Sequence, residues 1–210
     1  AEACRRVPGL KAEAALWSPE TGIVDSEGLM DHYHAVADAA GAMFLFGTAL
    51  ETVERNDGAW ELGLASGERL RARWVVNAAG LSGDKVAALA GLDIDAAGYR
   101  LRWCKGDYFR MKRPPPLPHL VYPLPSSHGL GVHLTMERGG GVRLGPDTAF
   151  VDRLDYAVDP AKAAPFAASV SRYWPGVTAD DLLPDQAGIR PKLSGPNEAW
   201  RDFVVQEESA

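Results

Sequence analysis

Residues 21–41, TGIVDSEGLMDHYHAVADAAG, carry apolar side chains at helical spacing. The members of this apolar stripe are Leu29, Met30, Tyr33, Val36, Ala37 and Ala40. The spacing predicts an amphipathic helix, because these positions share one helical face. Asp25 or Ser26 is suited to cap the start of the helix, and Gly41 is suited to follow its end.

Residues 42–76 change to patterns that are typical of strands. We expect one strand at AMFLF (42–46), followed by a three-strand meander of TALETVER, AWELGLA and RLRARWVVNAA. The turns of the meander, NDG and SGE, have the composition of hairpin turns. The last strand ends in the apolar run WVVNAA, which predicts burial on both faces. A short helix, GDKVAALAG, is expected next, with Ser82 at its start and Gly91 at its end.

The remaining segments read mainly as strands of an antiparallel sheet, not as β–α–β units. They are AALWSP (14–19), YRLRWCKGDYFRMK (99–112), HLVYPLP, GLGVHLTMER, GVRLGPD, DQAGIRPKLSG and RDFVVQ. PPPLP (114–118) is expected to be an extended loop. A helix is expected around residues 161–173.

Composition and charge narrow the class of protein without identifying it. Hydrophobic residues make up 46% and charged residues 24% of the 210 residues, as in ordinary globular domains. No apolar run approaches the roughly 20 residues of a membrane helix. The net charge is −6 and basic residues are scattered, so we expect no nucleic-acid partner. We expect a cytoplasmic protein, with peripheral association at the inner membrane left open.

Cysteine and histidine spacing indicates no metal site, so none is expected. Cys4 and Cys104 are lone thiols without zinc-binding or redox spacing. His32 and His34 lie two positions apart on an expected helix, so they point in different directions and form no metal pair.

The stretch VVNAAGLSGDKVAALAG (75–91) joins an apolar strand to a helix through small residues. Such a junction lets the backbone approach a nucleotide, yet no GxGxxG or Walker loop is present to hold phosphates. Spacing alone leaves two explanations open: tight strand-to-helix packing, or a phosphate loop that precedes residue 1. The chain opens with neither Met nor a signal sequence, which is typical of an internal segment.

Seven short motifs, taken in order, resemble the D-amino-acid-oxidase-like FAD-dependent oxidoreductases. They are SPETGIVDSEGL, VVNAAGLSGDKVA, KGDYF, LVYPLP, GLGVHLT, LGPD and AGIRPKLSGP with WRDFVVQ. Within this family the chain is similar to the L-2-hydroxyglutarate dehydrogenase/oxidase branch. The resemblance implies oxidation of a 2-hydroxy acid, L-2-hydroxyglutarate above all, by hydride transfer to FAD. The alternatives are an amino-acid oxidase of the glycine or sarcosine type and a non-catalytic binding module.

The resemblance also implies an α+β fold. A mostly antiparallel or mixed substrate-domain sheet with helices would comprise residues 1–24 and 98–195. A partial Rossmann-like FAD-binding domain would comprise residues 25–97 and 196–210, without the family's GxGxxG unit or its C-terminal glycine-rich segment. We therefore expect this segment alone to hold no FAD, to be inactive and to self-associate through apolar edges.

Arg190 and His133 are the leading candidates for the chemistry. Arg190 lies in AGIRP, which matches the stretch where glycine oxidases place an arginine on the substrate carboxylate, and a guanidinium binds a carboxylate bidentately. His133 shares a strand face with Thr135 and is the candidate base for the hydroxyl proton. A structural acid partner for Arg190 and a structural role for His133 are the alternatives.

Further candidates concern the rest of the substrate and the cofactor. Tyr108 and Tyr122 are candidate hydroxyl donors, although tyrosines on strands are commonly core residues. LGPD (144–147) is expected to shape the cavity wall. The candidate cations for a second carboxylate, with surface charge as the alternative, are Lys105, Arg143 and Lys192. The resemblance places beside FAD the residues Leu50, Ala78, Ala79 and Gly80.

Overall fold

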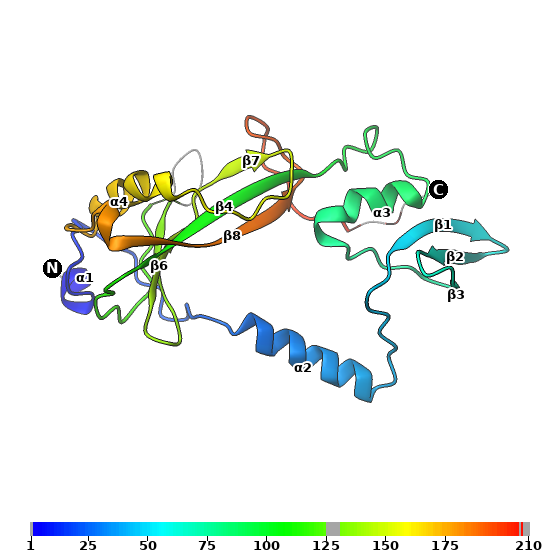
Figure 1. Cartoon of the computed structure of the whole chain (residues 1–210), viewed down its shortest axis with the longest axis horizontal. Coiled ribbons are helices and arrows are strands. Elements are labelled where there is room, and N and C mark those ends of the chain that lie inside the picture. Colours follow the sequence, from blue (N-terminus) through cyan, green and yellow to red (C-terminus); the bar gives the residue numbers. More distant parts are fainter. Residues whose placement is uncertain (1, 125–130, 206, 208–210) are drawn as a thin grey trace. The chain divides into compact units, whose positions relative to one another are not determined.

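The computed structural model describes residues 2–124, 131–205 and 207 (Figure 1). The chain forms two compact units. Unit 1 comprises residues 1–17 and 102–202, and unit 2 comprises residues 18–101 and 203–210. The mixture of helices and antiparallel sheets agrees with the expected α+β class. The division into a substrate half and a flavin half stays a prediction.

Unit 1 is built on a five-stranded antiparallel sheet around one long central strand. One edge of the central strand β4 pairs with β6 and β7, its other edge pairs with β8, and β5 extends the sheet beyond β6. The strands are β4 (Arg102–Met111), β5 (His133–Met136), β6 (Val142–Gly145), β7 (Ala149–Val151) and β8 (Leu182–Lys192). The segments expected to form strands at 99–112, 141–147 and 185–195 therefore contribute to this sheet.

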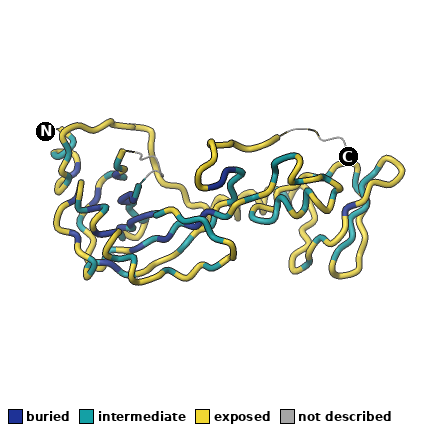
Figure 2. The backbone as a smooth tube through the Cα atoms, turned by 90° about the horizontal axis from the view of Figure 1, so that it is seen from above, coloured by how far each residue is buried: buried dark blue, intermediate teal, exposed yellow. Residues whose placement is uncertain are grey.

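Helix α4 (Ala163–Ser171) supplies the other layer of unit 1 (Figure 1). It follows the short η2 (Pro160–Lys162), at whose start the Asp159 side chain accepts a hydrogen bond from the Ala161 N–H. The apolar face of α4 packs on the sheet, and the Phe166 ring lies 4.8 Å from that of Phe109. Buried positions are concentrated in unit 1 and appear as dark segments in Figure 2. The remaining helical segments of unit 1 are α1 (Glu2–Arg6) and η3 (Ala179–Asp181).

Strand alternation divides the sheet of unit 1 into two faces. Leu144 of β6 pairs with Phe109 of β4 on one side and with Leu134 of β5 on the other. All three join the core beneath α4, so this side is the α4 face. The intervening positions lie on the opposite side, which we call the Arg190 face. Its members are Arg102, Cys104, Gly106, Tyr108, Arg110, His133, Thr135, Arg143, Gly145, Phe150, Gly188, Arg190 and Lys192.

Unit 2 contains the three-strand meander that the turn chemistry predicts. Its antiparallel strands are β1 (Leu50–Asn56), β2 (Ala59–Leu64) and β3 (Arg69–Ala72). Asp57 and Gly58 adopt φ of 46° and 75° between β1 and β2, and Gly67 adopts φ of 89° before β3. These positive values are the ones that tight hairpin turns need, so the two turn predictions are confirmed.

The helix expected from residue 26 is also present, as α2 (Ser26–Ala39). The Asp25 carboxylate caps it by accepting a hydrogen bond of 3.1 Å from the Gly28 N–H. The small-residue junction leads through η1 (Gly80–Ser82) into α3 (Gly83–Leu89). Ser82 precedes α3 but makes no capping hydrogen bond with its side chain, in contrast to the expectation.

Several expected strands are not formed in the described residues. AALWSP, AMFLF and the described part of RDFVVQ carry no strand, and HLVYPLP contributes only an isolated bridge between Val121 and Leu134. WVVNAA was expected to be buried on both faces, yet Trp74 is 82% and Val76 is 88% exposed. An extended apolar segment becomes a strand only when a neighbouring strand pairs with it. Gln206, Pro125 and residues 129–130 of these expected strands lie outside the described residues.

Candidate functional site

The Arg190 face brings together residues from all five strands of the unit 1 sheet. Arg190 on β8 lies directly opposite Cys104 on β4, Thr135 on β5 lies opposite Arg143 on β6, and His133 lies opposite Gly145. Directly opposed residues of an antiparallel pair project to the same side of a sheet. The two leading candidates, Arg190 and His133, therefore share one face although they are far apart in sequence.

His133 is held in place by the sheet and by an aromatic neighbour. It is 7% exposed, and its ring centroid lies 4.1 Å from that of Tyr122, with the rings tilted by 49°. The bridge between Val121 and Leu134 turns Val121 toward the core, so the next residue, Tyr122, lies on the side of His133. Tyr122 itself is 52% exposed.

Tyr108 carries a protonated hydroxyl close to two arginines. Burial raises the pKa of Tyr108, and the positive charges of Arg190 and Arg143 oppose this rise without cancelling it. The Arg143 guanidinium carbon lies 5.9 Å from the Tyr108 ring centroid. A phenol in this setting stays neutral at physiological pH and can donate a hydrogen bond to a carboxylate or hydroxyl.

Arg143 lies on the Arg190 face but is already engaged by two carboxylates. Its Nη2 lies 2.5 Å from Glu137 Oε1, and its Nε lies 2.6 Å from Asp185 Oδ2. The Nε contact is an ion pair and not an aligned hydrogen bond. Two nearby negative charges oppose the binding of a third carboxylate, so Arg143 is suited to organise β5, β6 and β8 more than to bind an acid.

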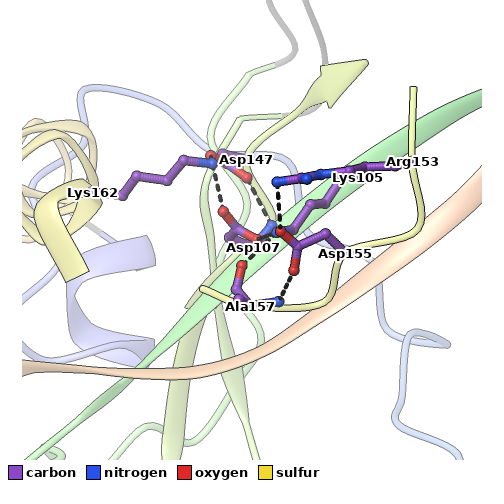
Figure 3. Close-up of polar contacts among 7 residues, drawn as sticks. All are labelled: Lys105, Asp107, Asp147, Arg153, Asp155, Ala157 and Lys162. Carbon is purple, nitrogen blue, oxygen red and sulfur yellow. Dashed lines mark hydrogen bonds and ion pairs between the residues drawn. The ribbon is translucent and has the colours of Figure 1, made fainter. Parts of the chain in front are cut away.

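Lys105 does not lie beside the candidate residues of the Arg190 face, because it projects from the α4 face of β4. Its Nζ donates a hydrogen bond of 2.5 Å to the Ala157 carbonyl and lies 3.3 Å from Asp107 Oδ1 (Figure 3). Lys162 donates to Asp107 Oδ2 at 2.5 Å and to Asp147 Oδ2 at 2.8 Å. Lys105, Asp107, Asp147 and Lys162 form what we call the lysine–aspartate cluster, so Lys105 is engaged away from the Arg190 face.

The LGPD segment (144–147), which is expected to shape the cavity wall, packs closely on β4. A Cβ at Gly106 would lie 2.5 Å from Pro146 Cβ, and a Cβ at Gly145 would lie 2.6 Å from the Tyr108 ring. Gly145 also has φ of 139°, a conformation that other residues rarely adopt. Asp147 fixes the turn by accepting a hydrogen bond of 2.7 Å from the Asp107 N–H. Glycine at both positions is therefore a requirement of this close approach.

Gly188 is a member of the Arg190 face that the sequence reasoning missed. It pairs with Gly106 and lies two positions before Arg190, so the sheet has no side chain at either position of this pair. A Cβ built at Gly188 would meet no atom within 4 Å. A glycine inside a strand often marks a bulge, or a place where a ligand or another backbone approaches closely. This signal was available in the sequence.

Two of the four cofactor candidates line one depression within unit 2. The depression has a volume of about 770 Å³, and both Leu50 and Ala79 contribute to its lining. Ala78 and Gly80 flank Ala79 in the chain but are not part of the lining. The missed residue here is Asn77, whose side chain donates to the Gly83 carbonyl at 2.7 Å and accepts from the Ala79 N–H at 3.2 Å. Asn77 thereby fixes the junction that precedes α3.

Within residues 2–124, 131–205 and 207, no three His, Cys, Asp or Glu side chains gather as a metal site, and Cys4 and Cys104 are free thiols. No helix in the same residues has the length and apolarity to cross a membrane.

Comparisons with known proteins identify the class to which this chain belongs. The family model described as FAD dependent oxidoreductase (DAO) matches residues 1–209. The chain belongs to this family of FAD-dependent oxidoreductases.

Individual relatives agree with this assignment. The chain is 31% identical to the mitochondrial L-2-hydroxyglutarate dehydrogenase of Arabidopsis thaliana, in a match that covers 99% of this chain and 52% of the relative. It is 29% identical to the L-2-hydroxyglutarate dehydrogenase of Indibacter alkaliphilus, over 78% of this chain and 41% of the relative. The chain thus spans about half the length of the plant relative and less of the bacterial one.

Solved structures share the fold at low sequence identity. L-alpha-glycerophosphate oxidase from Mycoplasma pneumoniae superimposes with a TM-score of 0.74 at 18% identity, over 91% of this chain and 51% of that chain. Glycine oxidase from Geobacillus kaustophilus superimposes with a TM-score of 0.69 at 22% identity, over 91% of this chain and 49% of that chain. These similarities establish the fold alone.

Proposed function

We propose that the complete gene product carrying this chain is an FAD-dependent oxidoreductase that converts a 2-hydroxy acid, L-2-hydroxyglutarate above all, to the 2-oxo acid. The observation that carries this proposal is the Arg190 face, where a guanidinium, a neutral phenol and a histidine share one side of the sheet. Two relatives named L-2-hydroxyglutarate dehydrogenase support the choice of substrate. In this proposal unit 1 is the substrate half and unit 2 belongs to the flavin half.

The residue types at the candidate cofactor positions of unit 2 are suited to contact a nucleotide cofactor. The Leu50 backbone would lie beside the adenine, and Ala78, Ala79 and Gly80 would lie along the nucleotide. The depression lined by Leu50 and Ala79 is consistent with this role, because small side chains leave the backbone open to close contact. When bound, FAD supplies an acceptor for the hydride that leaves C2 of the substrate.

Each polar group of the Arg190 face has a separate task in this reaction. Arg190 binds the C1 carboxylate through its planar fork, which fixes the position of C2. Tyr108, which remains protonated, donates a hydrogen bond to the bound acid. His133 accepts the proton of the substrate hydroxyl as C2 loses a hydride, so the products are the 2-oxo acid and a protonated imidazole.

Replacing His133 with glutamine in the complete gene product is expected to lower kcat about 100-fold, because glutamine keeps a polar side chain but cannot take up the proton. The wild-type kcat should fall toward acidic pH as the histidine becomes protonated, and the variant should lose this dependence. Steady-state kinetics across the neutral range measure both effects. An unchanged kcat throughout that range would remove His133 from the mechanism.

The alternative substrate within the family is an amino acid of the glycine or sarcosine type. An alcohol is a much weaker acid than an ammonium group, so oxidation of a hydroxy acid depends more strongly on a base such as His133. Parallel assays with L-2-hydroxyglutarate, glycine and sarcosine separate the two substrate classes. Turnover of glycine or sarcosine without turnover of the hydroxy acid would replace the proposed function by the amino-acid oxidase.

A further inference from the structure

We propose that Lys192 binds the second carboxylate of the substrate and selects dicarboxylic over monocarboxylic 2-hydroxy acids. This inference rests on the proposed function and adds to it the residue that determines specificity. Lys192 lies two positions after Arg190 on β8, so both cations project from the Arg190 face.

Lys105 and Arg143 are the two other candidate cations for this role, and the structure gives both of them carboxylate partners. Lys105 projects from the α4 face and belongs to the lysine–aspartate cluster. Arg143 lies on the correct face, but Glu137 and Asp185 neutralise its charge. In the described part of the chain, no carboxylate forms an ion pair with Lys192, so its positive charge is available to an incoming acid.

An aromatic ring positions the Lys192 ammonium without neutralising it. Its Nζ lies 5.7 Å from the centroid of Phe150, which is on β7 across β4 from the lysine's own strand. The side chain of Lys192 therefore reaches over β4 toward β7 instead of extending away from the sheet. A ring attracts an ammonium weakly through its π-face and leaves the N–H groups free to donate.

The spacing of Arg190 and Lys192 along β8 suits a short dicarboxylate. Residues two apart on a strand are separated by about 6.8 Å along the strand. A five-carbon dicarboxylate, with three carbons between its carboxylates, has a comparable span. Arg190 would bind the carboxylate next to the hydroxyl, and Lys192 would bind the distal one.

The test compares Lys192→Met with wild type in the complete gene product, using L-2-hydroxyglutarate and the monocarboxylate L-2-hydroxybutyrate. Loss of a charge-assisted contact is expected to raise KM for the dicarboxylate about 10-fold or more, with little change in kcat and no change in KM for the monocarboxylate. Lys192→Arg should restore most of the affinity, because it restores a cation. Lys11→Met, which removes an exposed lysine of unit 1 outside the sheet, is the matched control.

The outcomes distinguish failure of this inference from failure of the proposed function. A wild-type protein that oxidises neither acid would refute the proposed function. If wild type oxidises L-2-hydroxyglutarate and Lys192→Met has an unchanged KM for it, only the role of Lys192 is refuted. A parallel Arg102→Met variant examines the exposed arginine directly opposite Lys192. A dicarboxylate-specific loss in that variant alone would transfer the role to Arg102.

Discussion

Replacing Arg190 with leucine in the complete gene product is expected to lower kcat/KM for L-2-hydroxyglutarate by about 100- to 1000-fold. Removing one partner of a hydrogen-bonded charge pair costs about 2–5 kcal/mol, and each 1.4 kcal/mol corresponds to a factor of about ten. Leucine keeps apolar volume on β8 but removes both the charge and the planar fork. Steady-state kinetics, together with the flavin content of each preparation, measure the effect.

Arg190→Lys is the matched control for this prediction, because it keeps a positive charge at the same strand position. We expect it to recover part of the lost activity, since a lysine binds a carboxylate without the bidentate geometry of arginine. A leucine variant with normal flavin content and near-normal kcat/KM would show that another group binds the substrate carboxylate. Arg190 would then be a structural residue of β8.

Replacing Asp107 with alanine is expected to lower the free energy of unfolding by about 3 kcal/mol or more. Asp107 is 1% exposed and lies between two lysine ammonium groups, 2.5 Å from that of Lys162 and 3.3 Å from that of Lys105. Its removal takes away the ion pair of the buried Lys105 and leaves Lys162 with Asp147 alone. Denaturant unfolding of the chain with and without the substitution measures the change.

The same cluster determines how this stability difference depends on pH. Burial opposes the charge of Lys162, but its hydrogen bonds to Asp107 and Asp147 outweigh this effect, so the pKa of Lys162 is raised above 10.5. The stabilisation is therefore complete below the unfolded pKa and is lost only as pH rises through the still higher folded pKa. The difference between wild type and Asp107→Ala should stay constant across the neutral range. A variant as stable as wild type would contradict a stabilising role for the cluster.

Local patterns in the sequence predict the elements whose partners are close in the chain. The meander β1–β3 follows from alternation and turn residues such as Asp57 and Gly58, and α2 follows from its apolar stripe and the Asp25 cap. Segments such as AMFLF and WVVNAA are apolar enough for strands, but strand formation also needs a partner strand. The sequence pattern of a single segment contains no information about that partner.

The residues of the candidate site also differ in how far the sequence alone predicts their positions. Alternation along β4 already places Lys105 and Tyr108 on opposite faces, because they are three positions apart, so the exclusion of Lys105 could have been predicted. By contrast, the engagement of Arg143 depends on Asp185, which approaches it from another strand. The proximity of Arg190 and His133 likewise depends on the order of strands in the sheet, which local patterns do not specify.

The most direct test is anaerobic addition of L-2-hydroxyglutarate to the flavin-loaded complete gene product, with the visible absorbance of the flavin as the readout. We expect the oxidised flavin to be bleached in wild type. In Gly188→Val, whose side chain would occupy the open space beside Arg190, the flavin should be retained but bleached slowly or not at all. A gene product that takes up no flavin, or one whose bound flavin stays oxidised in the presence of the hydroxy acid, would contradict the assignment of the Arg190 face to hydroxy-acid oxidation.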